Sequence, residues 1–147
     1  MANMYYFAYG IYMVQNEIVV PCPEARFVGD GLLDNHKFLI NQFGDATIIR
    51  DDESIVYGII WDTSENEAKT LDAFEGVQFN NKYREFTAID LGNRKRLATV
   101  LVHIAKNSTP GTPKKKYIKS IIKAARDNSF PVTYIDQLRS WAKRGKK

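Results

Sequence analysis

The chain contains very little cysteine, with Cys22 as its single thiol in 147 residues. One thiol cannot form an internal disulfide, and it cannot supply a cluster of thiolate ligands for a metal. Cys22 also lies between two prolines, Pro21 and Pro23. These features suit a reducing compartment, so we expect a cytoplasmic protein.

Histidine is almost as rare, since the chain has two, His36 and His103. They lie far apart in the sequence, and His103 belongs to the apolar run 99–104. A metal site needs several ligands close together, which this pattern does not offer. We expect each histidine to be a structural or exposed residue, and no metal ligand.

Long apolar runs are absent as well, and no stretch approaches the length that crosses a membrane. The first residues are apolar, but they lack the basic start and the cleavage-site pattern of a signal peptide. No internal repeat is visible, and the lysine-rich ends are the only low-complexity segments. We therefore expect no membrane partner.

The formal net charge of +4 comes largely from two lysine-rich segments, 114–116 and 143–147. A nucleic-acid binder more often spreads Lys and Arg along one face and places aromatic residues between them. Here the aromatic residues fall in strand-like segments instead. The charge pattern therefore favours solvated ends, and we expect no nucleic-acid partner.

A chain of this length with 44% apolar residues has enough material for one hydrophobic core. We predict a single domain over residues 1–147, with a barrel core in 1–106 and a helical tail in 113–147. The oligomeric state is left open by the sequence.

An aromatic run with one glycine, Tyr5 to Met13, stands almost at the start of the chain. Aromatic residues favour a half-buried strand, and Gly10 can adopt backbone angles closed to other residues. The run therefore predicts a strand over 5–9 followed by a loop over 10–16. Backbone N–H groups of such a loop can converge on an anion or a developing oxyanion. The same residues also fit a first strand that simply ends in a turn.

Apolar runs separated by Asn, Gly and Asp predict further strands. The expected ranges are 25–33, 37–40, 46–49 and 55–61, followed later by a hairpin of 83–91 and 97–104 joined by a polar turn, Gly92–Arg96. Glycines in the first of these suggest a bulge or a sharp bend. Close strand spacing predicts an α+β fold: a small mixed β-barrel or strongly curved sheet, with one covering helix.

The covering helix is predicted over Glu65 to about Phe74. Ser64 and Glu67 match a capping box at its start, and Gly76 can terminate it in the left-handed conformation. Ala68, Leu71 and Phe74 recur at a spacing of three, which predicts one apolar face against the sheet. Glu75 comes directly after that face.

The proline-containing segment 107–113 cannot continue a strand, so we predict a linker to a helical tail. Apolar residues at helical spacing predict one tail helix around Tyr117 to Ala125 and another around Ile135 to Trp141, beyond the break at Phe130-Pro131. These helices are expected to pack on the sheet.

Several short segments, in this order, carry a resemblance to a known family. They are Tyr6-Phe7-Ala8-Tyr9-Gly10, Trp61, Leu71-Asp72-Ala73-Phe74-Glu75-Gly76-Val77, Tyr83-Arg84, and the tail residues Pro113, Tyr117, Ile121, Ala125, Arg126, Phe130-Pro131 and Tyr134. Together they resemble the γ-glutamylcyclotransferase family, which includes γ-glutamylamine cyclotransferases and AIG2-like proteins. The likeness spans nearly the whole chain.

The resemblance implies an enzyme that cyclises a γ-glutamyl group to 5-oxoproline and releases an amine or amino acid. It implies Glu75 as general acid and base; on sequence grounds alone, Glu75 also fits an exposed helix-end residue. It further implies that Tyr9, Gly10, Ile11 and Tyr12 form a substrate-binding loop whose backbone stabilises the amide oxygen. No metal or organic cofactor is required by this reaction.

Two further tyrosines have family counterparts. Tyr83 is expected to donate a hydrogen bond into the cavity, while Arg84 is expected to face solvent or to pair with an acidic neighbour. Tyr117 is a pocket candidate, although a residue of the core stripe explains it equally well.

The chain departs from the family at the loop after Gly10. Family members commonly have Ser-Asn or Thr-Leu where this chain has Ile11-Tyr12. The small polar pair can bind the substrate's ammonium and carboxylate, so its loss leaves the leaving group undetermined. It also leaves an alternative, a non-catalytic protein that holds an anionic small molecule in the same cavity.

Overall fold

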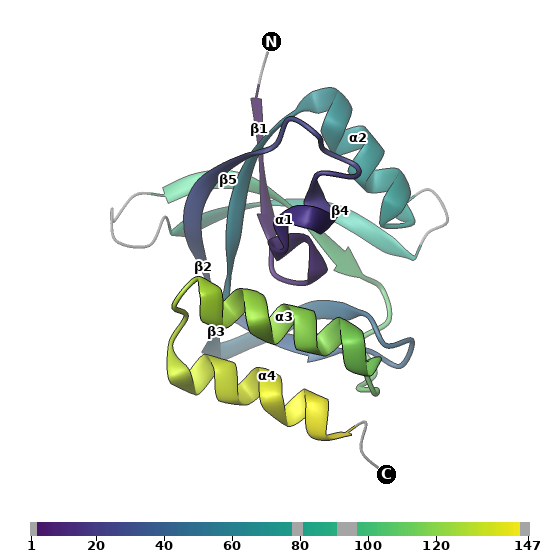
Figure 1. The fold of residues 1–147 in the computed structure, drawn as a ribbon, viewed down its shortest axis with the longest axis vertical. Helices are drawn as coiled ribbons and strands as arrows, with labels where there is room; N and C mark the ends of the chain where they lie inside the picture. Colours follow the sequence, from purple (N-terminus) through teal and green to yellow (C-terminus); the bar gives the residue numbers. More distant parts are fainter. Residues whose placement is uncertain (1–2, 78–80, 91–96, 145–147) are drawn as a thin grey trace.

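The computed structural model describes residues 3–77, 81–90 and 97–144. In chain order the elements are β1 (Asn3–Ala8), η1 (Ile11–Met13), α1 (Gln15–Ile18), β2 (Arg26–Ile40), β3 (Ala46–Ser64), α2 (Glu65–Phe74), β4 (Lys82–Asp90), β5 (Leu97–Ala105), α3 (Lys115–Asp127) and α4 (Val132–Arg144). Figure 1 shows α2 at the top of the barrel and α3 and α4 at the bottom.

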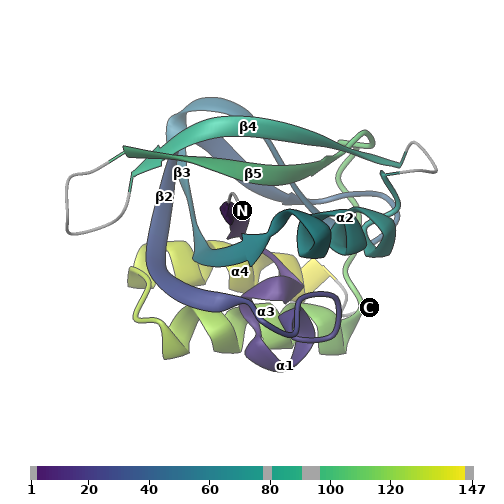
Figure 2. The same ribbon diagram turned by 90° about the horizontal axis from the view of Figure 1, so that it is seen from above.

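The strands form a closed barrel in the order β1-β3-β2-β4-β5. β1 closes the barrel by a parallel pairing of Tyr6 with Leu101 on β5, whereas the other neighbours pair antiparallel. Figure 2 shows β4 and β5 on one side of the barrel and α1, α3 and α4 on the opposite side. The prediction of a small mixed barrel with a covering helix and a helical tail is confirmed.

β2 and β3 are longer than the sequence predicted. The expected strands 25–33 and 37–40 are one strand, and so are 46–49 and 55–61. The polar residues taken as breaks lie within the pairing, because four residues of β3, 51–54, face the single residue Asn35 of β2. Asn35 is left-handed, with φ 61°, and lets the paired strands bend without ending. The predicted bulge near Gly29 is confirmed by a register shift between Phe27 and Gly29.

The loop predicted over 10–16 contains structure of its own. Ile11–Met13 forms the short 3₁₀ turn η1, and α1 begins at Gln15. The first bond of η1 runs from the Met13 N–H to the Gly10 carbonyl, at 3.1 Å. The loop is therefore a compact turn directly after β1.

The helix predicted after Ser64 is confirmed in its bounds and in its caps. The Ser64 side chain accepts from the Glu67 N–H, and the Glu67 side chain accepts from the Ser64 N–H. Gly76 adopts φ 77° directly after Glu75. The predicted face is wrong at Phe74, which is 54% exposed while Ala68 and Leu71 are buried. A spacing of three falls short of the 3.6-residue turn, so Phe74 has rotated away from the barrel.

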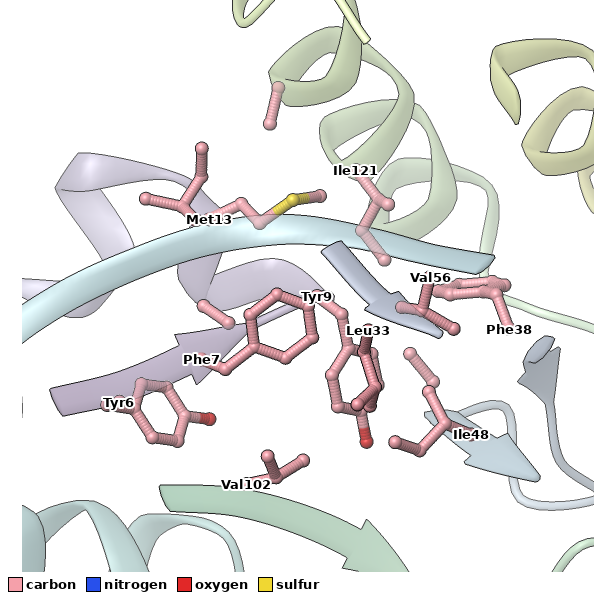
Figure 3. Packing of buried hydrophobic residues seen from close by; sticks show 14 of the residues in the cluster. Tyr6, Phe7, Tyr9, Met13, Leu33, Phe38, Ile48, Val56, Val102 and Ile121 are labelled. Atoms are coloured by element: carbon pink, nitrogen blue, oxygen red, sulfur yellow. The ribbon is translucent and has the colours of Figure 1, made fainter. Parts of the chain in front are cut away.

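The predicted hairpin is present as the antiparallel pair β4 and β5, and the polar turn expected at Gly92–Arg96 lies outside the described residues. The apolar residues of both tail helices join the same core as the strands. Figure 3 shows the rings of Tyr6 and Phe7 on β1, and of Tyr9 directly after it, between Ile121 of α3 and Val102 of β5. In the described ranges, no helix is long and apolar enough to cross a membrane.

Candidate active site

A cavity of about 170 Å³ lies where η1, the end of α2 and the start of β4 meet. We call it the inner cavity. It is lined by Tyr6, Tyr9, Gly10, Ile11, Tyr12, Asp45, Ala46, Glu75, Lys82, His103 and Tyr117. The structure thus brings together six of the seven predicted site residues, and Tyr83 is the exception.

Gly10 allows close packing at the mouth of the η1 turn. A β-carbon there would lie 3.3 Å from the Ala46 Cβ and 3.7 Å from the Tyr117 hydroxyl. Its φ is −119°, so the position is not left-handed, and a side chain there would need Ala46 to shift by a few tenths of an ångström. The Ile11 and Tyr12 N–H groups precede the first hydrogen bond of the turn, which leaves both outside its internal bonding.

Trp61 holds this loop from the barrel side. Its indole N–H donates to the Tyr12 carbonyl at 2.9 Å, and Trp61 is itself buried on β3. Burial raises the pKa of Tyr12, and the nearby Glu75 carboxylate raises it further. The Tyr12 side chain therefore stays a neutral phenol beside the carboxylate.

Glu75 is the C-terminal cap of α2, and its carboxylate lines the cavity. Lys82, the first residue of β4, places its ammonium nitrogen 2.5 Å from Glu75 Oε2. The two side chains are 16% and 14% exposed, so most of this ion pair is shielded from water. Salt screens partly buried ion pairs less than surface pairs, so the electrostatic attraction between Lys82 and the Glu75 carboxylate is strong.

Tyr117 and Tyr9 differ in what their hydroxyl groups can offer. The Tyr117 oxygen accepts from the Ala46 N–H at 3.1 Å, so its own proton is not used in that bond. Burial raises the pKa of Tyr117, which keeps that proton in place. The Tyr9 hydroxyl donates its proton to the His103 carbonyl at 2.6 Å, so that proton is already used within the protein. Tyr117 is therefore the better donor toward a ligand.

Tyr83 does not line the inner cavity, contrary to its predicted place. It is 42% exposed, whereas its neighbour Lys82 reaches Glu75. Successive strand residues point to opposite faces, so Tyr83 and Lys82 cannot share the cavity. Arg84 pairs with an acidic neighbour as expected, with its Nε 3.0 Å from Asp72 Oδ2.

His103 was expected to be structural or exposed, and it is a buried residue that also lines the cavity. Its Nε2 lies 2.6 Å from Asp72 Oδ1, and its exposed fraction is 1%. Burial lowers the pKa of His103, although the hydrogen bond to Asp72 opposes this. In the neutral imidazole Nε2 carries the proton that the carboxylate accepts, which makes Nδ1 an acceptor. Among the described residues Nδ1 has no hydrogen-bond partner.

A larger cavity of about 560 Å³ adjoins the inner one, and we call it the outer cavity. It shares Asp45, Glu75 and Lys82 with the inner cavity. The rest of its wall includes Asn41, Phe43, Phe74, Asn81, Lys106 and Asn107. The ion pair of Glu75 and Lys82 therefore stands at the boundary between the two spaces. A separate cavity of about 360 Å³, beside Phe27 and Lys123, contains none of the predicted site residues.

The sequence offered weak signals for the residues that the prediction missed. Lys82 stands directly before a predicted strand, and His103 lies inside an apolar run. Strand alternation can show that Lys82 and Tyr83 face opposite ways, but it cannot show which of them faces the cavity.

Known proteins resemble this chain in sequence and in fold. Residues 55–138 match the model of the AIG2-like family. γ-Glutamylcyclotransferase of Mus musculus is 26% identical over 148 residues, covering 92% of this chain and 77% of the mouse protein. The γ-glutamylcyclotransferase of Homo sapiens is 24% identical over 145 residues, with the same coverage. A solved γ-glutamyl cyclotransferase structure has a TM-score of 0.87 at 23% identity, covering 95% of this chain and 88% of that one.

Proposed function

Because the chain belongs to the AIG2-like family, we propose that it is a γ-glutamylcyclotransferase-like enzyme. It would convert a γ-glutamyl compound to 5-oxoproline and release an amine or an amino acid. The names of the mouse and human relatives support this reaction class. The observation that carries the proposal is the Glu75 carboxylate in the same small cavity as the Gly10 to Tyr12 turn.

The reaction is an intramolecular aminolysis. The substrate's α-ammonium gives a proton to Glu75, and the resulting amine nitrogen attacks the γ-carbonyl carbon. A new C–N bond closes a five-membered ring, after which the old C–N bond breaks. As the old bond breaks, the leaving nitrogen takes that proton from Glu75. The ring nitrogen then gives its second proton to the Glu75 carboxylate, which passes it to the released amine, so the products are a neutral lactam and an ammonium group, and atoms and charges balance. One carboxylate can serve both transfers in turn.

The protein's main contribution is to hold the substrate folded for attack and to stabilise the oxygen as it gains charge. The backbone N–H groups of Ile11 and Tyr12 and the hydroxyl of Tyr117 belong to residues of the cavity wall and are candidate donors to this oxygen. Lys82 contacts Oε2 of Glu75, and a carboxylate has a second oxygen that can take a proton. The step requires no metal or organic cofactor.

The test is a panel of γ-glutamyl-amines and γ-glutamyl-amino acids incubated with the protein, with 5-oxoproline followed by mass spectrometry. We expect at least one compound to yield 5-oxoproline and free amine in equal amounts. The absence of 5-oxoproline from every compound would overturn the proposal.

A second candidate is a non-catalytic protein that binds an anionic small molecule in the same cavity. The ion pair between Glu75 and Lys82 favours it, because Lys82 engages the carboxylate that the reaction would use as a base. Isothermal titration calorimetry separates the two candidates. A γ-glutamyl compound that binds and is recovered intact supports the binder, whereas turnover supports the enzyme.

A further inference from the structure

The outer cavity meets the inner cavity at the carboxylate that the proposed reaction uses. The inner cavity has about 170 Å³, below the roughly 300 Å³ at which sites for drug-sized ligands begin. It suits a single glutamyl group. The bond that breaks would lie at Glu75, since this carboxylate returns the proton to the leaving nitrogen. The leaving group therefore extends across the shared boundary into the outer cavity.

Two exposed aromatic side chains face this outer space. Phe74, the last residue of α2, is 54% exposed, and Phe43, in the turn between β2 and β3, is 72% exposed. Both line the outer cavity. Exposure of large apolar groups to water is unfavourable in free energy, and this cost is relieved when another apolar surface covers them. A leaving group with a large apolar side chain would cover both rings.

The boundary also has a cation at a defined place, the ammonium of Lys82 against Glu75. When Glu75 takes a proton from the substrate it becomes neutral, so Lys82 loses its counter-charge. An amino acid as leaving group has its carboxylate on the carbon next to the leaving nitrogen, and this places an anion beside Lys82. A simple amine brings no such anion. Asp45 lies on the same boundary and would repel the carboxylate, which directs it to the Lys82 side.

We propose that the outer cavity is the leaving-group site and that it selects amino acids with a large apolar side chain. Lys82 binds the leaving group's carboxylate, and Phe43 and Phe74 cover its side chain. The substrate class is then γ-glutamyl-amino acids such as γ-glutamyl-phenylalanine, in preference to γ-glutamylamines. This assignment rests on the proposed function.

The experiment compares kcat/KM for three substrates, followed as 5-oxoproline release. They are γ-glutamyl-phenylalanine, γ-glutamyl-alanine, which lacks the ring, and γ-glutamyl-phenethylamine, which keeps the ring and lacks the carboxylate. We expect the first to exceed each of the other two by about tenfold or more, the scale of a charged hydrogen bond or of a few buried apolar atoms.

Variants separate the carboxylate contact from the ring contact. The ratio of kcat/KM between two substrates is compared within one variant, so a general loss of activity cancels. Lys82→Met should abolish the preference for the carboxylate and keep the preference for the ring, while Lys82→Arg should retain both. Phe74→Ala should abolish the preference for the ring and keep the preference for the carboxylate. Phe86→Ala is the matched control, because Phe86 is 55% exposed on β4 and lines neither cavity.

The outcomes are distinguishable. If none of these compounds, nor any in the wider panel, yields 5-oxoproline, the proposed function fails and this assignment fails with it. If turnover occurs with equal kcat/KM for the phenylalanine and alanine compounds, or for the phenylalanine and phenethylamine compounds, the leaving-group assignment alone is overturned.

Discussion

Glu75 is the residue on which the proposed chemistry depends. Glu75→Gln keeps the shape of the side chain and an oxygen that Lys82 can donate to, but an amide cannot take and return a proton. We expect the variant to remain folded and to lose about 10²- to 10⁴-fold in kcat, the usual range for a proton-transferring group. Steady-state kinetics on the best substrate measures this, with thermal denaturation as the test of folding.

The matched control for this change is Glu65→Gln, at the exposed first turn of the same helix. It removes one negative charge from the same helix without reaching the cavity, so its kcat should equal that of the wild type. A Glu75→Gln protein with near-normal kcat would require a different base, and His103 would be the first residue to examine, because it lines the same cavity.

Tyr12 should limit the size of the substrate. Tyr12 lines the inner cavity and is one of its larger side chains. Because the glutamyl group would occupy this cavity, Tyr12→Ala should weaken binding of the preferred substrate and admit a bulkier acyl part, such as an α-methyl-glutamyl group, whereas Ile11→Ser should have the smaller effect. The KM of the preferred substrate and the relative rates of compounds with and without the α-methyl group measure this. Identical values in both variants and the wild type would mean that neither side chain limits the cavity.

At the residue scale, the sequence predicted what a local motif can carry. The motif around Glu75 and the glycine after β1 identified residues that the structure brings into one cavity. Lys82 and His103 could not be identified in this way. Lys82 reaches Glu75 through the register of β4, and His103 meets Asp72 across the contact between β5 and α2. Both contacts depend on burial and on strand facing, which the chain order does not determine.

The end of α2 is the element that positions the carboxylate. Gly76 adopts φ 77°, and a β-carbon there would find ordinary space, 3.5 Å from the Asn81 side chain. Gly76→Ala therefore introduces backbone strain alone, worth about 1–2 kcal/mol. We expect a matching loss in the free energy of unfolding and a marked fall in kcat, because relief of the strain moves Glu75. Urea denaturation and kinetics measure the two effects.

Ser64→Ala is the control for this change, since it weakens the opposite end of the same helix. Loss of that cap costs about 0.5–2 kcal/mol, and the Ser64 hydroxyl accepts from Glu67 in the capping box. Its kcat should stay near the wild-type value. If both variants lose kcat in proportion to stability, the helix end has no separate role in placing Glu75.

Elements differ in how well the sequence predicted them. α2 carries its own boundary signals in Ser64, Glu67 and Gly76, so its bounds were correct. β2 and β3 carry misleading signals, since the acidic residues of 51–54 look like a turn but form a bulge inside a continued strand. Whether a polar segment ends a strand depends on the partner strand, and that information is not local.

At the scale of the whole molecule, a polar cluster links α2, β4 and β5 beside the hydrophobic core. Asp72 on α2 contacts His103 on β5 and Arg84 on β4. Tertiary contacts of this kind join the covering helix to the side of the barrel that carries the hairpin. A change in these contacts should therefore change the free energy of global unfolding.

His103 should make that stability depend on pH. Burial lowers its pKa in the folded protein below the usual 6.5; Lys82 acts in the same direction, and Asp72 and Glu75 oppose it. Below about pH 6.5 the unfolded chain takes up a proton that the folded protein resists, so stability is full above that pH and falls on acidification. His103→Gln removes this proton while keeping a side chain that can donate to Asp72. Its free energy of unfolding, measured with urea from pH 8 to pH 5, should fall less than that of the wild type.

His36→Gln, outside the cluster, is the matched control for losing a histidine. Parallel curves for the wild type and the His103 variant would show that the buried imidazole does not couple protonation to folding.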